Sequence, residues 1–288
     1  MKKVILVLVM MLFILAIGGC DDESDGGTSP MEIPLEETIT HVEEDVDFFI
    51  AVHCEPGGDP LSTNYVALNW LALTDLVNSA DDHNMKLTLL MNPQWATYIL
   101  EDEHRLGLVR DWESNGHEIG LHSHGPHMNS WNGYTNQEQY FNSPDFIGTM
   151  DDLMDVVNQL PASEQMVTAC IASEDQEYDF PSGIIYETNG GADKLDDLWS
   201  TPTEYTWNGQ DVLRVTHARY AVSFSEVNID LQQMNKILDD NESDEIMGIV
   251  FHCFEYADDS APYNALFRLL EENGIHTNTV SAVVEGYE

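Results

Sequence analysis

The amino-acid sequence predicts an α/β fold, in the form of a distorted or incomplete (β/α) barrel with about seven strands. From Asp47 onward, short apolar runs of strand length alternate with segments whose apolar residues recur at helical spacing. This alternation is typical of parallel strands that are joined by crossover helices. A chain of 288 residues is also long enough to fill one large barrel. Residues 46–288 are therefore predicted to form a single barrel domain.

The first half of this domain is predicted to contain three strands and the helices between them. The apolar run at 48–52 is a first strand, and it leads to a Pro-Gly-Gly turn. A helix follows, with Ser62 as its N-cap and apolar residues three or four positions apart up to Val77. A second strand at 87–91 stops at Asn92-Pro93, because proline breaks the ladder of backbone hydrogen bonds. Another helix then leads to a third strand at 117–122.

The second half is predicted to be less regular. Apolar residues between 146 and 160 share one helical face, and a fourth strand spans 167–171. Residues 174–212 are irregular and rich in aromatic residues, with short strand candidates at 184–186, 212–215 and 220–224. A helix at about 226–239 precedes a strong strand at 246–253. A helix at 261–272 and a strand at 277–284 are expected to close the chain.

The N-terminus is predicted to be a lipoprotein signal peptide over residues 1–20. Lys2 and Lys3 precede an apolar run from 4 to 17, and Gly18-Gly19-Cys20 follows. This run is shorter than the ~20 residues that span a membrane comfortably. Ile-Gly-Gly-Cys resembles a bacterial lipobox, so Cys20 is expected to carry the lipid that anchors an exported protein at the cell envelope. Residues 21–45, which are acidic and contain Gly and Pro, are expected to form a flexible tether.

The charge of the chain excludes several partners. There are 52 acidic and 10 basic residues, which give a net charge of −42. Such a surface repels nucleic acid and anionic lipid, so contact with the membrane is expected through the lipid alone. The charge indicates either a very soluble exported protein or one adapted to high salt, where ions screen the self-repulsion. The scarcity of lysine throughout the chain favours adaptation to salt.

Three cysteines remain after Cys20, and their state is open. Cys54 and Cys253 each lie beside a candidate site histidine, and Cys170 lies in the fourth strand. Export permits a disulfide between Cys54 and Cys253, if the first and last strands are neighbours. The alternative is three buried free thiols.

A dense group of histidines indicates a metal site. Four histidines, His117, His122, His124 and His127, fall within eleven residues at the end of a predicted strand. A strand that delivers imidazoles to a turn can place several nitrogens around one point, and zinc prefers histidine nitrogen together with carboxylate oxygen. Glu55, at the end of the first strand, supplies such a carboxylate.

The same stretch resembles the second motif of the polysaccharide deacetylases, carbohydrate esterase family 4 with its NodB-homology domain. In that family, Gly-His-Glu-Ile-x-x-His-[Ser/Thr]-x-x-His supplies two metal-binding histidines. Here the motif begins at Gly116, and His122 matches the first ligand. The second position is Pro126, so the resemblance implies a one-residue insertion that makes His127 the second ligand, with His124 as the alternative. The family also has a distorted (β/α) barrel.

Two more stretches resemble family motifs. The family's first strand ends in Thr-Phe-Asp-Asp, where the second Asp binds metal and the first is the general base. Matched to this sequence, the metal ligand becomes Glu55 and the base position becomes Cys54, which is no equivalent base; His53 and Asp59 are the nearest candidates. The last motif, Leu-x-x-His, resembles the four residues that end at His252, which implies that His252 is the general acid.

Two family motifs are absent in recognisable form. Nothing between Ser173 and Gly183 matches the Arg-Pro-Pro-Tyr-Gly motif, and Arg214 and Arg219 either replace its arginine or pair with acidic residues. The Asp-x-x-Asp-Trp motif has an echo only at 196–199. Two loops are rich in aromatic residues, which either stack on sugar rings or form the cores of those loops; these residues are Trp131, Tyr134, Tyr140, Phe141, Tyr178, Trp199, Tyr205 and Trp207.

Taken together, the sequence predicts a lipid-anchored, metal-dependent deacetylase that acts on an N-acetylated carbohydrate. One divalent ion, with zinc preferred, is expected on Glu55, His122 and His127, and His252 is expected to protonate the departing amine. Two alternatives remain: a related metal-dependent amidohydrolase, and a catalytically degenerate carbohydrate-binding lipoprotein. The missing base favours the binding protein, whereas the retained histidines favour the enzyme.

Overall fold

The computed structural model describes residues 47–128, 130–163, 165–190, 195–223, 229–239 and 245–287. The predicted signal peptide, Cys20 and the predicted tether lie outside these residues. In the part of the chain that is described, no helix is long and apolar enough to cross a membrane.

The described strands form one mixed sheet that is not closed into a full barrel. Its order is β6-β10-β1-β2-β3-β4-β5-β8-β7, and β9 pairs with β10. The pairs from β10 through β1 to β8 are parallel, whereas β6 and β7 run antiparallel to their neighbours. The strands are β1 (Phe48–Cys54), β2 (Leu87–Met91), β3 (Glu118–His124), β4 (Thr168–Ala172), β5 (Tyr186–Thr188), β6 (Trp199–Ser200), β7 (Thr203–Trp207), β8 (Gln210–Val215), β9 (Ala218–Arg219) and β10 (Ile246–His252).

This arrangement confirms the predicted α/β fold and incomplete barrel, but the sheet has ten strands among the described residues rather than about seven. The additional strands are short ones in the irregular segment after β5. One of them, β7, forms a hairpin with β8 through Asn208-Gly209, where both residues have a positive φ. An Asn-Gly pair at such a turn is a strong hairpin signal.

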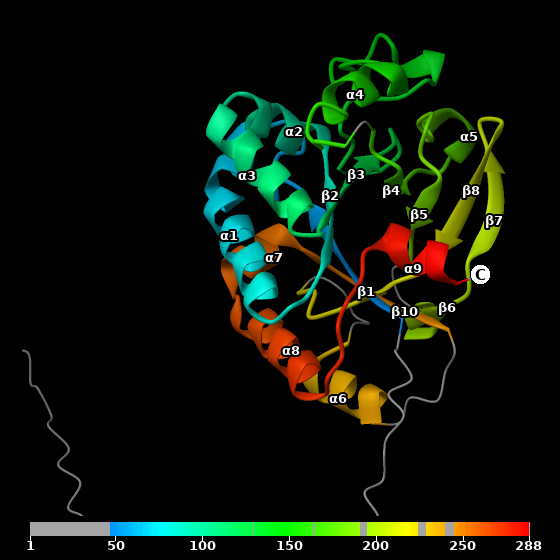
Figure 1. The fold of residues 1–288 in the computed structure, drawn as a ribbon. Coiled ribbons are helices and arrows are strands. Elements are labelled where there is room, and N and C mark those ends of the chain that lie inside the picture. The colour runs from blue at the N-terminus through cyan, green and yellow to red at the C-terminus, as the bar shows by residue number, and fades with distance from the viewer. Residues whose placement is uncertain are drawn as a thin grey trace, which may run out of the picture. The chain divides into compact units, whose positions relative to one another are not determined.

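Helices cover the outer face of the sheet, with α1, α2, α3, α7 and α8 on one side of it in Figure 1. Their bounds are α1 (Thr63–Asp82), α2 (Pro93–Leu100), α3 (Glu103–Ser114), α4 (Met150–Val157), α5 (Gln176–Asp179), α6 (Leu231–Asp239), α7 (Cys253–Asp258), α8 (Ala261–Glu272) and α9 (Val280–Gly286). Ser62 caps α1 as predicted. The single helix expected before β3 is divided in two, because Asp102 accepts hydrogen bonds from the backbone N–H groups of His104 and Arg105 and so starts α3.

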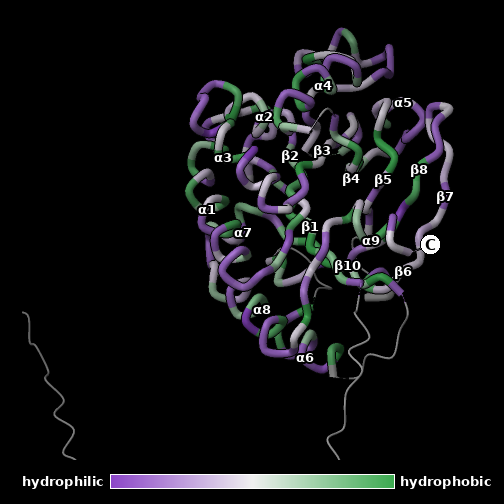
Figure 2. The backbone as a smooth tube through the Cα atoms, viewed as in Figure 1, coloured by the Kyte–Doolittle hydropathy of each residue, from purple (hydrophilic) through white to green (hydrophobic). Residues whose placement is uncertain are grey.

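Both faces of the central strands are buried, which explains their continuous apolar runs (Figure 2). Successive residues of a strand point to opposite faces. In β1, Phe48, Ile50 and Val52 join the main core under the helices. Phe49 and Ala51 join a second cluster on the concave face.

The end of the chain differs from the expected strand at 277–284. Residues 280–286 form helix α9 instead, capped by Thr279. Val280, Val283 and Val284 are buried on the concave face of the sheet together with Phe49. The Val280 backbone N–H donates to the Thr88 hydroxyl in β2 and the Ser281 backbone N–H to Glu118 at the start of β3, so the helix lies near the amino ends of these strands.

The three described cysteines, Cys54, Cys170 and Cys253, are buried free thiols. No bridge joins Cys54 to Cys253, although Cys54 ends β1 and Cys253 directly follows the neighbouring strand β10. Burial raises the pKa of all three thiols, so they stay protonated at neutral pH.

Candidate metal centre

The register of the parallel strands gathers histidines at one end of the sheet. His53 on β1 pairs with His252 on β10, and His122 on β3 pairs with Cys170 on β4. Since residues two apart in a strand share a face, His124 lies on the same face as His122, and Glu55 follows His53 in the same way. All of them lie at carboxyl ends of strands, the edge where α/β barrels place their sites.

Glu55, His122 and His124 meet at one point. The His122 Nε2 atom lies 2.8 Å from Glu55 Oε1 and 2.8 Å from His124 Nε2, and the distance from His124 Nε2 to Glu55 Oε1 is 3.2 Å. His122 is buried, and Glu55 and His124 are mostly buried. These three residues form one group with the geometry to hold a metal ion.

The three side chains of this group have too few protons to make a hydrogen bond in each of their contacts. His122 Nδ1 lies 2.9 Å from the carbonyl oxygen of Cys170, which can only accept, so Nδ1 carries the proton of the neutral ring. Burial lowers the pKa of His122 and favours that neutral ring. The Nε2 atom of His122 then turns a lone pair toward the Glu55 carboxylate, so two hydrogen-bond acceptors face each other. A proton on His124 does not remove the repulsion between His122 and Glu55. A cation among the three acceptors would relieve it, so the residues fit a metal ion.

The electrostatics of Glu55 agree with a cation site. Burial by itself would raise the pKa of this carboxyl group. The hydrogen bonds and charges of His122 and His124 outweigh burial and hold the pKa well below its ordinary value. Glu55 is therefore an anion at neutral pH, as a metal ligand must be.

His252 is held by a second carboxylate on its far side. Its Nδ1 atom lies 3.2 Å from Glu255 Oε2, and its Nε2 atom lies 3.8 Å from Glu55 Oε1. Glu255 is buried and accepts hydrogen bonds from the Ser223 backbone N–H at 2.7 Å and from the Ser223 hydroxyl at 3.0 Å. Glu255 thus fixes the orientation of the His252 ring.

His53 and His217 also line the site. Together with His122, His124 and His252 they form a group that we call the histidine wall. The His53 ring stacks on His122 with centroids 3.9 Å apart, and His217 approaches its edge at 5.7 Å. Burial, aided by the neighbouring imidazoles, holds the pKa of His53 well below its ordinary value and lowers that of His217 to about 3. Both rings are neutral at pH 7. The buried Nε2 atom of His53 has no hydrogen-bond partner among the described residues.

Two further groups of potential ligands overlap the first. His53, Glu55 and His252 form one, and His53, His122 and Cys170 form the other. In the first group, His122 Nε2 lies 2.8 Å from both Glu55 Oε1 and His124 Nε2, whereas His252 Nε2 lies 3.8 Å from Glu55 Oε1. The raised pKa of Cys170 disfavours its thiolate as a ligand. Glu55, His122 and His124 are therefore the group with the clearest need for a cation.

These side chains line a cavity of about 410 Å³. Its wall includes the histidines of the centre, with His217 and Arg219 on the side of β9 and Ser173 and Asn189 beyond β4 and β5. The size lies within the range of small-molecule sites. The cavity offers one arginine, two carboxylates (Glu55 and Glu174) and five imidazoles, together with several uncharged polar groups.

The structure does not bring every predicted residue into this cavity. His127 is exposed in the turn after β3, where its Nε2 atom lies 2.8 Å from the Tyr140 hydroxyl. His124, the alternative, takes the place beside Glu55 and His122. Of the two base candidates, His53 lines the cavity, whereas Asp59 is exposed and accepts a hydrogen bond from the Leu61 backbone N–H.

The two arginines have different surroundings. Arg214 Nε donates to Glu187 Oε2 at 2.7 Å, and its guanidinium lies over the Tyr205 and Trp207 rings. Arg214 thus pairs with an acidic residue, as one of the two sequence interpretations expected. Arg219 lines the cavity. The aromatic residues of the two loops do not line this cavity, and the sugar-stacking interpretation finds no support from their positions among the described residues.

Sequence reasoning missed two members of the site, His217 and Glu255. His217 lies just after β8, so its position near a strand end could have indicated that it belongs to the site. Glu255 lies three residues after His252 in the first turn of α7, which brings its carboxylate back to the imidazole. That contact depends on a helix starting directly at the end of β10, which the sequence pattern did not reveal.

Comparison with solved structures finds the same fold at low sequence identity. The 4-alpha-glucanotransferase from Thermococcus litoralis is 13% identical with a TM-score of 0.53; the match covers 84% of this chain and 40% of that one, so this chain spans less than half of its length. Puue allantoinase is 13% identical with a TM-score of 0.52, over 84% and 90% of the two chains. A probable polysaccharide deacetylase from Pseudomonas aeruginosa PAO1 is 12% identical with a TM-score of 0.52, over 84% and 90%.

The comparison with protein-family models and that with curated proteins gave no match. At 12–13% identity, the structural likeness establishes the fold and nothing finer. The chain therefore has the incomplete α/β barrel fold that is also found in a probable polysaccharide deacetylase and in an allantoinase.

Proposed function

We propose that this protein is a metal-dependent hydrolase that removes the acetyl group from an N-acetylated carbohydrate. The observation that carries the proposal is the proton-deficient contact among Glu55, His122 and His124 at the carboxyl ends of β1 and β3. The shared fold with a polysaccharide deacetylase supports the substrate class. Zinc is the preferred ion, because two imidazole nitrogens and one carboxylate leave a fourth position open for substrate or water.

The residues around this point have separate chemical roles. A divalent cation held there would supply Lewis-acid polarisation of an acyl carbonyl and make water easier to deprotonate. Glu55 remains anionic at neutral pH, and His122 is locked in one tautomer by the Cys170 carbonyl. His252, whose Nδ1–H donates to Glu255, turns Nε2 toward the cavity and can hold a proton there for the departing amine nitrogen.

The test measures bound metal and acetate release on the same variants. His122→Ala should lose stoichiometric metal, because one of three ligands is removed. His252→Ala should keep its metal and lose acetate release from chito-oligosaccharides by about 10²-fold or more, as expected for removal of a general acid. His104→Ala, an exposed histidine in the first turn of α3, is the matched control and should change neither quantity.

Other outcomes separate the alternatives. Loss of metal in His252→Ala would make His252 a ligand instead of the acid. Wild-type protein that binds glycans and releases no acetate would indicate the degenerate carbohydrate-binding protein. Hydrolysis of a different amide is the second enzymatic candidate, favoured by the equal likeness to an allantoinase. Release of product from allantoin with no acetate from glycans would support that candidate.

We further propose that the protein is exported and anchored at the cell envelope through a lipid on Cys20. The lipobox-like sequence before Cys20 supports this location. Cys20→Ser should move the protein from the membrane fraction to the soluble fraction. Continued membrane association of the variant, at normal expression, would contradict the proposal.

A further inference from the structure

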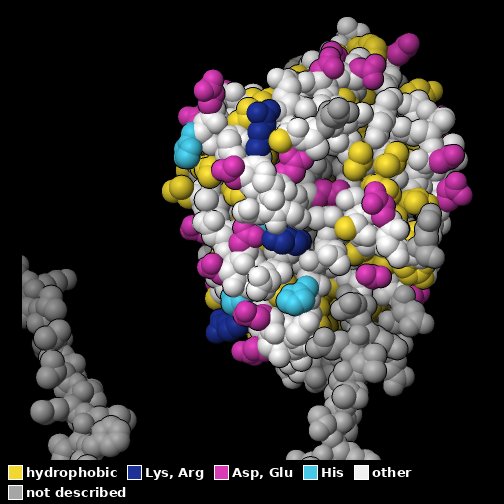
Figure 3. Space-filling view, viewed as in Figure 1, with side chains coloured by type: hydrophobic (Ala, Val, Ile, Leu, Met, Phe, Trp, Pro, Cys, Tyr) yellow, Lys and Arg dark blue, Asp and Glu magenta, His cyan; other side chains and the backbone are white. Residues whose placement is uncertain are grey.

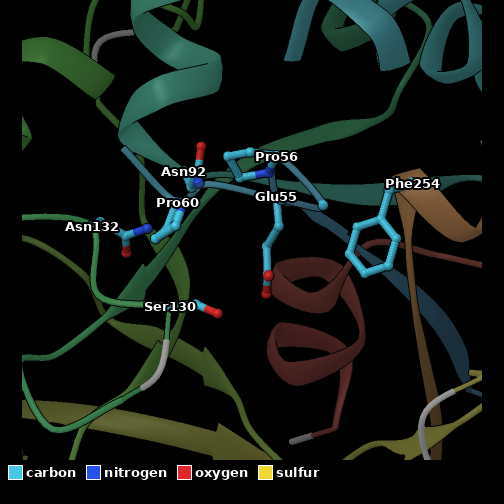
Figure 4. A pocket seen from close by; sticks show the side chains of 9 residues that line it. Glu55, Pro56, Pro60, Asn92, Ser130, Asn132 and Phe254 are labelled. Carbon is cyan, nitrogen blue, oxygen red and sulfur yellow. The ribbon is translucent and has the colours of Figure 1, made fainter. Parts of the chain in front are cut away.

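A second, smaller cavity also has Glu55 in its wall, and no histidine lines it among the described residues. It has a volume of about 200 Å³ (Figure 4). This is below the ~300–1,000 Å³ of pockets that hold drug-sized ligands, so it suits a single ring. Glu55 and Ser130 line this cavity and the larger one, and the two therefore adjoin at the candidate metal centre. A linear ligand can place one unit in each.

One wall of the small cavity carries an unpaired buried donor. Asn92 is fully buried, and it caps α2 by accepting a hydrogen bond from the Trp95 backbone N–H at its Oδ1 atom. Its own backbone N–H donates to the Cys54 carbonyl. The Nδ2 group of Asn92 has no partner among the described residues. Burying an amide donor without a partner costs free energy, which a ligand hydroxyl in the cavity would recover.

The opposite wall is an aromatic ring held by the backbone of the β1–α1 loop. Figure 4 shows Phe254 facing the Glu55 side chain across the cavity from Asn92 and Pro60. Gly57 has a φ of +75°, and a Cβ atom there would lie 2.7 Å from Phe254 Cβ. The glycine therefore lets Phe254 approach the loop. Pro56 and Pro60 add further apolar surface to the cavity.

The residues that line the cavity favour an uncharged ligand. Glu55 is the one charged residue among the described residues of this cavity, and the polar groups beside it are the amides of Asn92 and Asn132 and the hydroxyl of Ser130. Asn132 is itself fixed, because its Oδ1 accepts a hydrogen bond from the His124 backbone N–H. An anionic ligand would find no arginine or lysine here. An apolar ring with amide donors around it matches a sugar, which has an apolar ring face and neutral hydroxyls.

We propose that this cavity is a subsite for one neutral pyranose unit of the substrate, next to the unit whose acetamido group lies at the metal centre. Asn92 Nδ2 donates to a hydroxyl of that unit, and Phe254 packs against the face of its ring. The inference rests on the proposed function, since it assigns the subsite to a glycan that is deacetylated at the adjoining cavity.

The test compares KM and kcat for N-acetylglucosamine oligomers from chitobiose to chitopentaose. Asn92→Ser keeps an oxygen that can cap α2 and removes the amide donor. Phe254→Leu keeps apolar volume and removes the ring. Each variant should raise KM for the longer oligomers by about tenfold with little change in kcat, as expected for one lost hydrogen bond or ring contact. Inhibition by cellotetraose, a neutral oligomer without acetyl groups, should weaken in parallel.

Two control variants make comparable changes elsewhere, one at a helix N-cap and one at an aromatic ring. Asp102→Ser alters the N-cap of α3, and Phe141→Leu alters an exposed ring; neither residue lines the cavity. Circular dichroism checks that each variant is folded. If one of the two test variants does not fold, the other still tests the subsite. Wild-type length dependence and cellotetraose inhibition in folded Asn92→Ser and Phe254→Leu would overturn the subsite and leave the deacetylase proposal intact. Absence of acetate release by the wild type from every oligomer would instead overturn the proposed function, and the subsite with it.

Discussion

At the residue scale, the alternation of side chains along β3 determines which histidines can share a metal. His122 and His124 are two residues apart on an extended strand, so both rings point to the concave face. His127 lies beyond Gly125-Pro126, where the chain has left the strand and the imidazole is free to pair with Tyr140. The family-like spacing pointed to His127, whereas the strand geometry brings His124 to Glu55.

This geometry predicts opposite results for two neighbouring substitutions. His124→Ala should weaken zinc binding by about 10²-fold, because it removes an imidazole that lies within 3.2 Å of the Glu55 carboxylate. His127→Ala should leave zinc affinity unchanged. Isothermal titration of both variants with zinc measures the effect, and His127→Ala is the matched control for loss of a histidine in the same stretch. The reverse ranking would restore His127 as the ligand.

Some residues of the site could be predicted from the sequence and others could not, according to what places each side chain in the fold. Glu55, His122, His252 and the alternative His124 stand at ends of apolar runs, and parallel strands bring such ends to one edge, so their proximity was predictable. Glu255 and Asn132 depend on the path of loops and on a helix that begins directly after β10. Such contacts arise from tertiary packing, which a hydrophobic pattern does not encode.

At the element scale, the segment after Ile275 shows how composition can mislead. Three valines between 280 and 284 favoured a strand, because β-branched residues are enriched in strands. Their positions at i, i+3 and i+4 also fit one face of a helix, and Thr279 caps that helix. The Val280 backbone N–H donates to the Thr88 hydroxyl, and the Ser281 backbone N–H donates to Glu118. Burial inside the barrel, together with these hydrogen bonds at the start of α9, favours the helix.

We therefore expect α9 to contribute to stability as an internal plug. Val283 is buried against the second core cluster, so Val283→Ala should lower the free energy of unfolding by about 2 kcal/mol through lost apolar burial and a cavity. Ala282→Ser, on the exposed side of the same helix, should change it by less than about 0.5 kcal/mol. Urea unfolding followed by circular dichroism measures both. Equal effects of the two substitutions would mean that α9 does not pack into the barrel in solution.

At the scale of the whole molecule, the contrast is between an acidic exterior and a nearly neutral interior site. The net charge is −42, and Figure 3 shows acidic side chains scattered over one face with few basic ones between them. His53, His122 and His217 stay neutral, because burial lowers the pKa of each ring. The negative field draws cations toward the protein, and the carboxylate of Glu55 offers them a coordinating position inside the cavity.

The same charge should make the fold depend on salt. Repulsion among 52 acidic groups, balanced by 10 basic ones, opposes compaction, and the chain has too few cations to neutralise it internally. The Debye length falls from about 10 Å at 0.1 M salt to about 3 Å at 1 M, so repulsion between neighbouring carboxylates continues to weaken well above physiological salt. The midpoint of thermal unfolding should therefore rise with NaCl throughout this range. Sucrose at matched osmolality is the control, because it stabilises compact states without screening charge. A midpoint that stays flat in NaCl, or rises equally in sucrose, would leave solubility rather than salt adaptation as the reason for the charge.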